Sequence, residues 1–168
     1  MVNGLDFNKH LAFTSSEDVK DISKPLLDCY GLSYFNYVKI YKNSEHITLT
    51  TNPYWLKHFF DKQYHKVVAF EKLSSSLDQS PVIWDLFEED NAIRHDEREY
   101  FQIDHGATLI NSTEEYNEFY YFATKPGNYG IMNFYINQSD ILRNFVDYFK
   151  DQAGLLIDKA EKEKFKRS

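Results

Sequence analysis

The residues whose types could do chemistry are few and scattered along the chain. The single cysteine, Cys29, could act as a nucleophile only beside a base such as His46, His58 or His65. Nothing in their spacing indicates a Cys–His pair, so we interpret Cys29 as a small buried thiol. The sequence also contains no GxSxG, no HExxH and no glycine-rich phosphate loop. These observations argue against an enzyme.

Two pairs of neighbouring residues, His95-Asp96 and Asp104-His105, carry side chains that could bind a metal. Adjacent residues point in different directions on a helix or a strand, so such pairs are weak signals for a metal site. The charged run "RHDERE" (94–99) fits the solvated face of a helix. The sequence therefore predicts no metal site and no cofactor.

The composition bounds the class of protein. A chain of 168 residues fits one domain, and an aromatic content of 17% favours a sheet. A net charge of −7 argues against direct binding of nucleic acid. One cysteine excludes an internal disulfide and fits a reducing cytoplasm. No signal peptide and no apolar run long enough to span a membrane is found, so we expect a cytoplasmic protein without a membrane partner.

The order of apolar and turn-forming residues predicts an α+β domain with a five-stranded antiparallel sheet. The predicted elements are helices over 15–32, 52–60, 64–73, 94–104 and 139–164, a hairpin over 33–51, and strands over 106–110, 118–125 and 130–137.

An aromatic helix is predicted directly after the hairpin. Asn52 is a good N-cap, and Pro53 suits the first helical position because its missing N–H would have no partner there. Trp55 and Phe59 are four residues apart and so lie on one side of this helix. These rings either pack in the core or line a cavity that a ligand fills.

At the level of the whole chain, the residues resemble a known family. The run "LSYFNYVKIYKNSEHITLTTNPYWLKHFF" (32–60), a polar loop, "PVIWDLF" (81–87) and "HGATLI" (105–110) resemble the N-terminal autoinducer-binding domain of LuxR-type transcription regulators. The divergent LuxR-like sensors are the most similar subgroup, and the likeness extends over about residues 11–156. It implies a PAS/GAF-like α-β-α sandwich with helices on both faces of the sheet, a small-molecule cavity and a homodimer.

The resemblance assigns pocket residues one at a time. Trp55 matches the pocket Trp whose indole N–H binds a ligand carbonyl, and Phe59 stands where the family has a Tyr. Trp84, three residues after Pro81, matches the second pocket Trp, and Gly106 matches a Gly before a strand. We also expect ligand contacts from tyrosines whose buried hydroxyls would need partners or that lie near these rings, namely Tyr34, Tyr37 and Tyr64.

One departure from the family concerns the acidic residue that binds the signalling ligand. The family binds the amide N–H of an acyl-homoserine lactone with an Asp, but the corresponding run here is "HKVVAFEK" (65–72), with Val68 or Ala69 at that place. Glu71 is the nearest acid and is displaced. A charge-assisted hydrogen bond contributes about 1.5–3 kcal/mol, or roughly tenfold to a hundredfold in affinity. We therefore expect an apolar or aromatic ligand rather than a standard acyl-homoserine lactone.

The chain is expected to be one ligand-sensing and dimerisation domain over 1–160, with a linker or tail over 161–168 and no DNA-binding domain. DNA would be reached only through a missing C-terminal helix-turn-helix domain. Part of the apolar stripe of the final helix, including Phe149 and Leu156, is predicted to meet a second copy. The alternative is a PAS/GAF-like dimerisation or protein-interaction module whose core is filled by its own side chains.

Overall fold

The fold is built on one antiparallel sheet. The computed structural model describes residues 9–87 and 91–166. Its strands are β1 (Tyr34–Tyr41), β2 (Glu45–Thr50), β3 (Val82–Ile83), β4 (Asp104–Ser112), β5 (Tyr116–Thr124) and β6 (Phe165–Lys166). In the described residues the strand order is β3-β4-β5-β1-β2-β6, and each neighbouring pair is antiparallel. The predicted five-stranded antiparallel sheet is confirmed as β3 to β2, and the two-residue β6 extends its edge.

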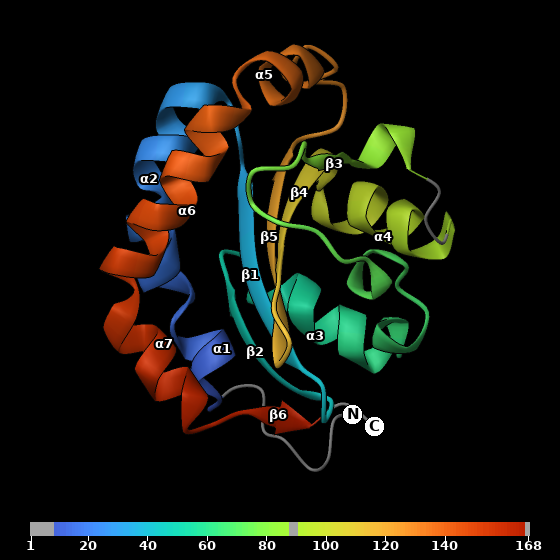
Figure 1. Cartoon of the computed structure of the whole chain (residues 1–168). Coiled ribbons are helices and arrows are strands. Elements are labelled where there is room, and N and C mark those ends of the chain that lie inside the picture. The colour runs from blue at the N-terminus through green and yellow to red at the C-terminus, as the bar shows by residue number, and fades with distance from the viewer. Residues whose placement is uncertain (1–8, 88–90, 167–168) are drawn as a thin grey trace.

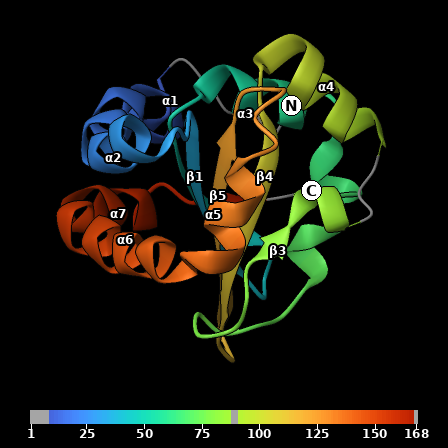
Figure 2. The same ribbon diagram turned by 90° about the horizontal axis from the view of Figure 1, so that it is seen from above.

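Helices cover both faces of this sheet. They are α1 (Leu11–Thr14), α2 (Ser16–Tyr30), α3 (Pro53–Asp61), α4 (Asn91–Phe101), α5 (Ile131–Asn137), α6 (Ser139–Gln152) and α7 (Gly154–Glu161). Helices α1, α2, α6 and α7 lie on one face, and α3 and α4 lie on the other (Figures 1 and 2). The predicted α+β sandwich is therefore confirmed. Across the described residues, none of these helices combines the length and the apolar character needed to cross a membrane.

Strand β1 divides the core into two halves because its side chains alternate between the faces. Phe35 and Tyr37 join the larger cluster beneath α2 and α6, and the ring centroids of Phe35 and Phe149 are 4.8 Å apart. Tyr34 and Val38 join a second cluster on the α3 and α4 side. A residue's position along a strand therefore decides which half of the core it can reach.

The run at 130–137 is a helix, so the strand predicted there is wrong. Ile131 and Tyr135 are four residues apart, both are buried, and both face the same core. The hydroxyl of Tyr135 donates to the carbonyl of His105 at 2.7 Å, which fixes α5 to β4. A short apolar and aromatic run fits either a strand or a buried helix, and tertiary packing selects the helix here. The missing strand is supplied by β3.

Two predicted helices also differ in the structure. Residues 64–73 form two single 3-10 turns, Tyr64–Lys66 and Phe70–Lys72, instead of one helix. The C-terminal helix is divided at Ala153 into α6 and α7.

The expected tail at 161–168 is partly ordered within the domain. Glu161 accepts hydrogen bonds from Lys39 at 2.8 Å and from the hydroxyl of Tyr41 at 2.6 Å. Lys164 lies 3.7 Å from Glu161, and β6 pairs with β2. Residues 161–166 therefore belong to the folded domain, whereas 167–168 lie outside the described residues.

Candidate ligand-binding cavity between the sheet and helices α3 and α4

A cavity of about 60 Å³ lies on the α3 and α4 side of the sheet. Its lining combines six aromatic rings with aliphatic side chains and a small set of polar groups. The lining residues are Tyr34, Asn36, Val38, Thr48, Trp55, Leu56, Phe59, Val68, Phe70, Glu71, Trp84, Ile93, Glu97 and Tyr121. Of the predicted ligand contacts, Tyr34, Trp55, Phe59 and Trp84 are brought together here.

Helix α3 brings Trp55 to the cavity. The side chain of Asn52 accepts a hydrogen bond from the backbone N–H of Trp55 at 3.1 Å, and Pro53 opens the helix, as the sequence predicts. The indole packs against Phe101, with ring centroids 5.2 Å apart, and against His58 at 5.7 Å. Within the described part of the chain, its indole N–H has no hydrogen-bond partner. The ring is therefore held by packing while its polar atom is available to a ligand.

The second tryptophan is held differently. The indole N–H of Trp84 donates to the hydroxyl of Thr108 at 2.9 Å, so this donor is already used inside the protein. Gly106 does not line the cavity but lies against the Trp84 ring, where an added Cβ would come within 2.3 Å of it. Trp84 thus forms a fixed wall, and Gly106 provides the space for it.

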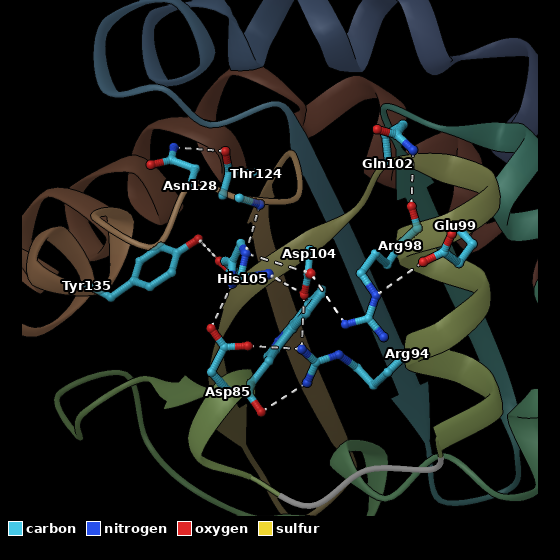
Figure 3. A network of polar contacts seen from close by, with 12 residues as sticks. Asp85, Arg94, Arg98, Glu99, Gln102, Asp104, His105, Thr124, Asn128 and Tyr135 are labelled. Carbon is cyan, nitrogen blue, oxygen red and sulfur yellow. Dashed lines mark hydrogen bonds and ion pairs between the residues drawn. The ribbon is translucent and has the colours of Figure 1, made fainter.

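A polar network around Arg94 attaches α4 to the sheet (Figure 3). Arg94 of α4 donates to the carbonyl of Trp84 at 3.0 Å, to Asp85 at 3.0 Å and to Asp104 at 3.1 Å. These bonds join α4, the turn that follows β3 and the start of β4. They fix the position of α4, which carries two of the cavity residues.

Three side chains of this network, Asp85, Asp104 and His105, place possible metal ligands within 4.8 Å of one another. Figure 3 shows that their atoms already bind other groups. The N–H of Gly127 donates to His105 Nε2 at 3.1 Å, so Nδ1 carries the proton that reaches Asp85 at 2.8 Å. The guanidinium of Arg94 neutralises both carboxylates. We interpret the cluster as a structural network that holds α4, the turn after β3 and the start of β4 together.

The polar part of the cavity comes from β1, β2 and α4. Asn36 is 9% exposed, and its Oδ1 has no hydrogen-bond partner among the described residues, as is also true of the hydroxyl of Thr48. Beside them lie Tyr34 and the buried carboxylate of Glu97. Burial, followed by the negative charge of Glu97, raises the pKa of Tyr34, so its hydroxyl stays protonated. Buried polar atoms without partners are rare in folded proteins, and ordered water or a ligand usually binds them.

The acidic lining was only partly predictable. Glu71, interpreted from the sequence as displaced, lines the cavity. The prediction that residues 94–99 form a solvated face holds for the exposed His95, Arg98 and Glu99. It is wrong for Asp96 and Glu97, which are only 8% and 7% exposed. The signal that could have revealed Glu97 is its spacing of four residues from Ile93 and from Phe101, both of which pack in the same cluster.

Tyr64 lies beside the cavity and does not line it. Its hydroxyl donates to Asp96 at 2.7 Å, and His58 Nε2 lies 2.7 Å from the same carboxylate oxygen. Burial raises the pKa of Asp96, but hydrogen bonds from His58, Tyr64 and His95 outweigh it and hold the pKa at about 2. The cluster joins α3 to α4 and so fixes the outer wall of the cavity.

Tyr37 does not contact the cavity, contrary to the expectation that it lines the pocket. Its side chain points to the opposite face of the sheet, where it packs against Phe149 and donates to Glu118 at 2.6 Å. The reason is the alternation along β1, which places Tyr34 and Tyr37 on different faces.

Two further residues, Phe149 and Cys29, lie elsewhere than the sequence indicated, while the predicted interface role of Leu156 stays a prediction. Phe149 is 0% exposed within the domain's own core, so it cannot contact a second copy as predicted. Leu156 packs against the same core and is only partly buried. Cys29, expected to be buried, is exposed on α2, and in the described residues no hydrogen bond joins it to a histidine.

Comparisons with known proteins bear on the fold. No family model and no curated protein sequence matches the chain. The structure is similar to SdiA in complex with octanoyl-rac-glycerol, with a TM-score of 0.60 and 16% identity over 92% of this chain and 64% of that chain. It is also similar to CepR2 from Burkholderia cenocepacia, an N-acylhomoserine lactone dependent LuxR family transcription factor. In that pair the TM-score is 0.53 with 16% identity, over 91% of this chain and 99% of that chain.

The chain has the fold of a LuxR-type autoinducer-binding domain. The resemblance predicted over residues 11–156 is thereby confirmed at the level of fold. The chain spans 64% of the length of the SdiA chain.

Proposed function

We propose that the chain is a non-enzymatic ligand-sensing and dimerisation domain of a LuxR-type transcription regulator. The observation that carries this proposal is the cavity between the sheet and helices α3 and α4. Its aromatic walls surround the buried oxygens of Asn36 and Thr48, which have no partner in the described residues. Ligand sites combine apolar walls with a few convergent polar groups in this way.

The ligand is proposed to be a small apolar or aromatic molecule rather than a standard acyl-homoserine lactone. Phe59 brings no hydroxyl to the cavity. The resemblance places the family's Asp at Val68 or Ala69, and of these two residues Val68 lines the cavity. A volume of about 60 Å³ is also small beside the roughly 300–1,000 Å³ of typical ligand pockets. A long acyl chain would enter only if the walls moved apart.

In the proposed mechanism, the ligand completes the α3 and α4 half of the core. Binding would stabilise the domain and so shift a folding or dimer equilibrium, in proportion to the ligand's preference for the folded form. A C-terminal helix-turn-helix domain would read that shift on DNA, in the cytoplasm. Leu155, which is 79% exposed on α7, and its neighbour Leu156 are proposed as contacts of the homodimer in place of Phe149.

The test is native mass spectrometry of the purified chain, followed by denaturing release and a thermal-shift panel. The panel includes octanoyl glycerol, N-octanoyl homoserine lactone and small aromatic alcohols and amines. We expect a reproducible small mass lost on denaturation, or a rise in melting temperature with at least one compound. No bound mass together with no shift would refute the sensing function.

The small cavity also favours one alternative, a ligand-free PAS/GAF-like dimerisation module. In that case the space of about 60 Å³ holds only ordered water, which would bind the oxygens of Asn36 and Thr48. Filling the cavity with Val38→Phe discriminates the two. It would stabilise a ligand-free module or leave it unchanged, whereas in a sensor it would abolish every thermal shift given by the panel.

A further inference from the structure

Two buried polar side chains of the cavity are neighbours on adjacent strands. Asn36 of β1 and Thr48 of β2 both line the cavity, and they are only 9% and 2% exposed. Asn36 pairs with Thr50 and Val38 pairs with Thr48, so Asn36 and Thr48 are diagonal neighbours on one face of the sheet. Diagonal neighbours have Cα atoms about 7–8 Å apart, which leaves room for one small group to contact both side chains.

The hydrogen-bonding needs of this pair select the group that fits between them. Within the described part of the chain, Asn36 and Thr48 are the lining residues that carry a fully buried side-chain oxygen without a partner. Asn36 Oδ1 can only accept, whereas the Thr48 hydroxyl can donate. A hydroxyl placed between them donates to Oδ1 and accepts from Thr48, so it satisfies both. A carbonyl cannot donate, and an ammonium group cannot accept.

The remaining space suits hydrocarbon better than water. A cavity of about 60 Å³ holds about four to six water-sized centres, at about 10–15 Å³ each. An ordered water needs about two to four polar partners, so water fits between Asn36 and Thr48 but not beside apolar walls such as Phe59, Phe70 and Val38. Cavities with apolar walls stay dry and bind apolar molecules. The cavity therefore combines room for one hydroxyl with room for a short hydrocarbon body.

We propose that the cavity binds a small neutral alcohol. Its hydroxyl donates to Asn36 Oδ1 and accepts from the hydroxyl of Thr48, and its hydrocarbon body lies against the aromatic walls. The inference rests on the proposed sensing function and specifies the chemistry of its ligand. The volume limits the body to a short chain or one small ring, so a single hydroxyl contributes a large share of the selectivity. The hydroxyl takes the place of any water bound between the two side chains.

A series of compounds with one ring and different head groups tests the proposal. Cyclopentanol donates and accepts, cyclopentanone only accepts, the ammonium group of cyclopentylamine only donates, and methylcyclopentane does neither. Each is titrated at neutral pH into the purified chain and followed by two-dimensional ¹H–¹⁵N NMR. Because only the alcohol satisfies both side chains, we expect it to bind at least about fivefold more tightly than the ketone and the amine.

Two variants locate the effect. Thr48→Val and Asn36→Leu keep the approximate size of each side chain and remove its polar atoms. Each is expected to weaken cyclopentanol about five- to tenfold, while methylcyclopentane binds equally or more tightly. The NMR spectrum and a melting curve establish that each variant is folded. If Asn36→Leu does not fold, Thr48→Val carries the test, because valine has the shape of threonine.

Thr124→Val is the matched control. Thr124 is also a buried strand threonine, but it does not line the cavity, and its hydroxyl donates to the carbonyl of Gly31 at 3.0 Å. Like Phe122 two residues earlier, it points to the opposite face of the sheet. We expect this variant to be less stable than the wild type and to keep all four affinities, which separates lost binding from lost stability.

The outcomes separate this inference from the sensing function. Equal or tighter binding of the ketone or the amine overturns the alcohol inference and leaves a sensor for another class of ligand. Cyclopentanol affinity that is unchanged in the folded variants also overturns it, and means that Asn36 and Thr48 bind ordered water only. So does the absence of cyclopentanol binding at about 10 mM. In each case binding of octanoyl glycerol or N-octanoyl homoserine lactone keeps the sensing function, and no binding of any compound removes both.

Discussion

Gly106 lies directly against the indole of Trp84, so closely that a Cβ at this position would be 2.3 Å from the ring. The contact explains why a glycine occupies the beginning of a buried strand, where its conformational freedom is otherwise a disadvantage. It also lets the ring of Trp84, a residue that lines the cavity, lie close against β4.

Gly106→Ala is therefore expected to destabilise the domain by about 1–3 kcal/mol, because Trp84 must shift in a closely packed core. Urea unfolding monitored by tryptophan fluorescence measures the change. Gly154→Ala is the control, since nothing lies within 4 Å of a Cβ there. In a helix that change is expected to stabilise by about 0.4–1 kcal/mol. Equal effects at the two sites would contradict the packing role of Gly106.

Thr108 and Thr48 are both buried threonines, and the hydroxyl of only the first has a partner among the described residues. Thr108 accepts the indole N–H of Trp84 at 2.9 Å, whereas the hydroxyl of Thr48 has none among the described residues. Thr108→Val leaves a buried donor unpaired and should cost about 1–3 kcal/mol, while Thr48→Val should leave the ligand-free domain unchanged or more stable. Urea unfolding of both variants is the measurement. A loss of stability in Thr48→Val would show that its hydroxyl already binds an internal group.

Much of the fold is predictable from local patterns. The alternation in β1, the Asn52-Pro53 helix start and the β1–β2 hairpin follow from period and capping alone. The resemblance located the Trp55 and Trp84 walls of the cavity. These features depend on residues close in sequence, which is why they could be identified.

Two of the remaining errors have a common physical cause, namely contacts between distant segments. Whether 130–137 is a strand or a helix depends on packing of Tyr135 beneath His105. Whether α4 presents Glu97 to solvent or to the cavity depends on Arg94, which fastens the helix through residues on other elements. Tyr37 was misplaced for a different reason: the period of two was visible, but the face carrying the cavity was not.

Asp96 makes the stability of the domain depend on pH. Its pKa is lowered to about 2 in the folded state from an ordinary value of 3.8, so the folded form favours the charged carboxylate. The resulting stabilisation is fully present above about pH 5 and is lost as the pH falls from about 4 to 2. At pH 7 Asp96→Asn should cost about 1.5–3 kcal/mol, because it removes hydrogen bonds to a charged acceptor.

Urea unfolding at pH 7, 5 and 3 checks the sign of this effect. The difference between wild type and Asp96→Asn should be the same at pH 7 and 5, and smaller at pH 3. Asp61→Asn is the control, since among the described residues Asp61 pairs only with exposed Lys57, at 2.6 Å. Such surface pairs contribute about 0–1 kcal/mol. A difference that grows toward pH 3 would contradict the cluster as described.

Phe149 lies in the core and Leu155 on the surface, so substituting the first tests folding and substituting the second tests dimerisation. Phe149→Ala should destabilise each protomer by about 3–5 kcal/mol through the loss of core packing. Leu155, which is 79% exposed, should tolerate Asp with little change in stability. If α7 contacts a second copy, Leu155→Asp converts dimer to monomer in light scattering after size exclusion. A dimer that persists in Leu155→Asp excludes this interface, and a monomeric wild type excludes the dimer.

Substitutions of Trp55 distinguish core packing from ligand binding, because its ring packs against other rings while its N–H is available to a ligand. The ring packs against Phe101 and His58, so Trp55→Ala should cost about 3–5 kcal/mol whether or not a ligand exists. Trp55→Phe keeps an aromatic ring and removes an N–H that has no partner in the described residues. It should cost less than about 1.5 kcal/mol in the ligand-free domain. A ligand that accepts this N–H should bind about three- to tenfold more weakly to Trp55→Phe. Unchanged affinity for every bound compound would show that the indole acts only as a wall.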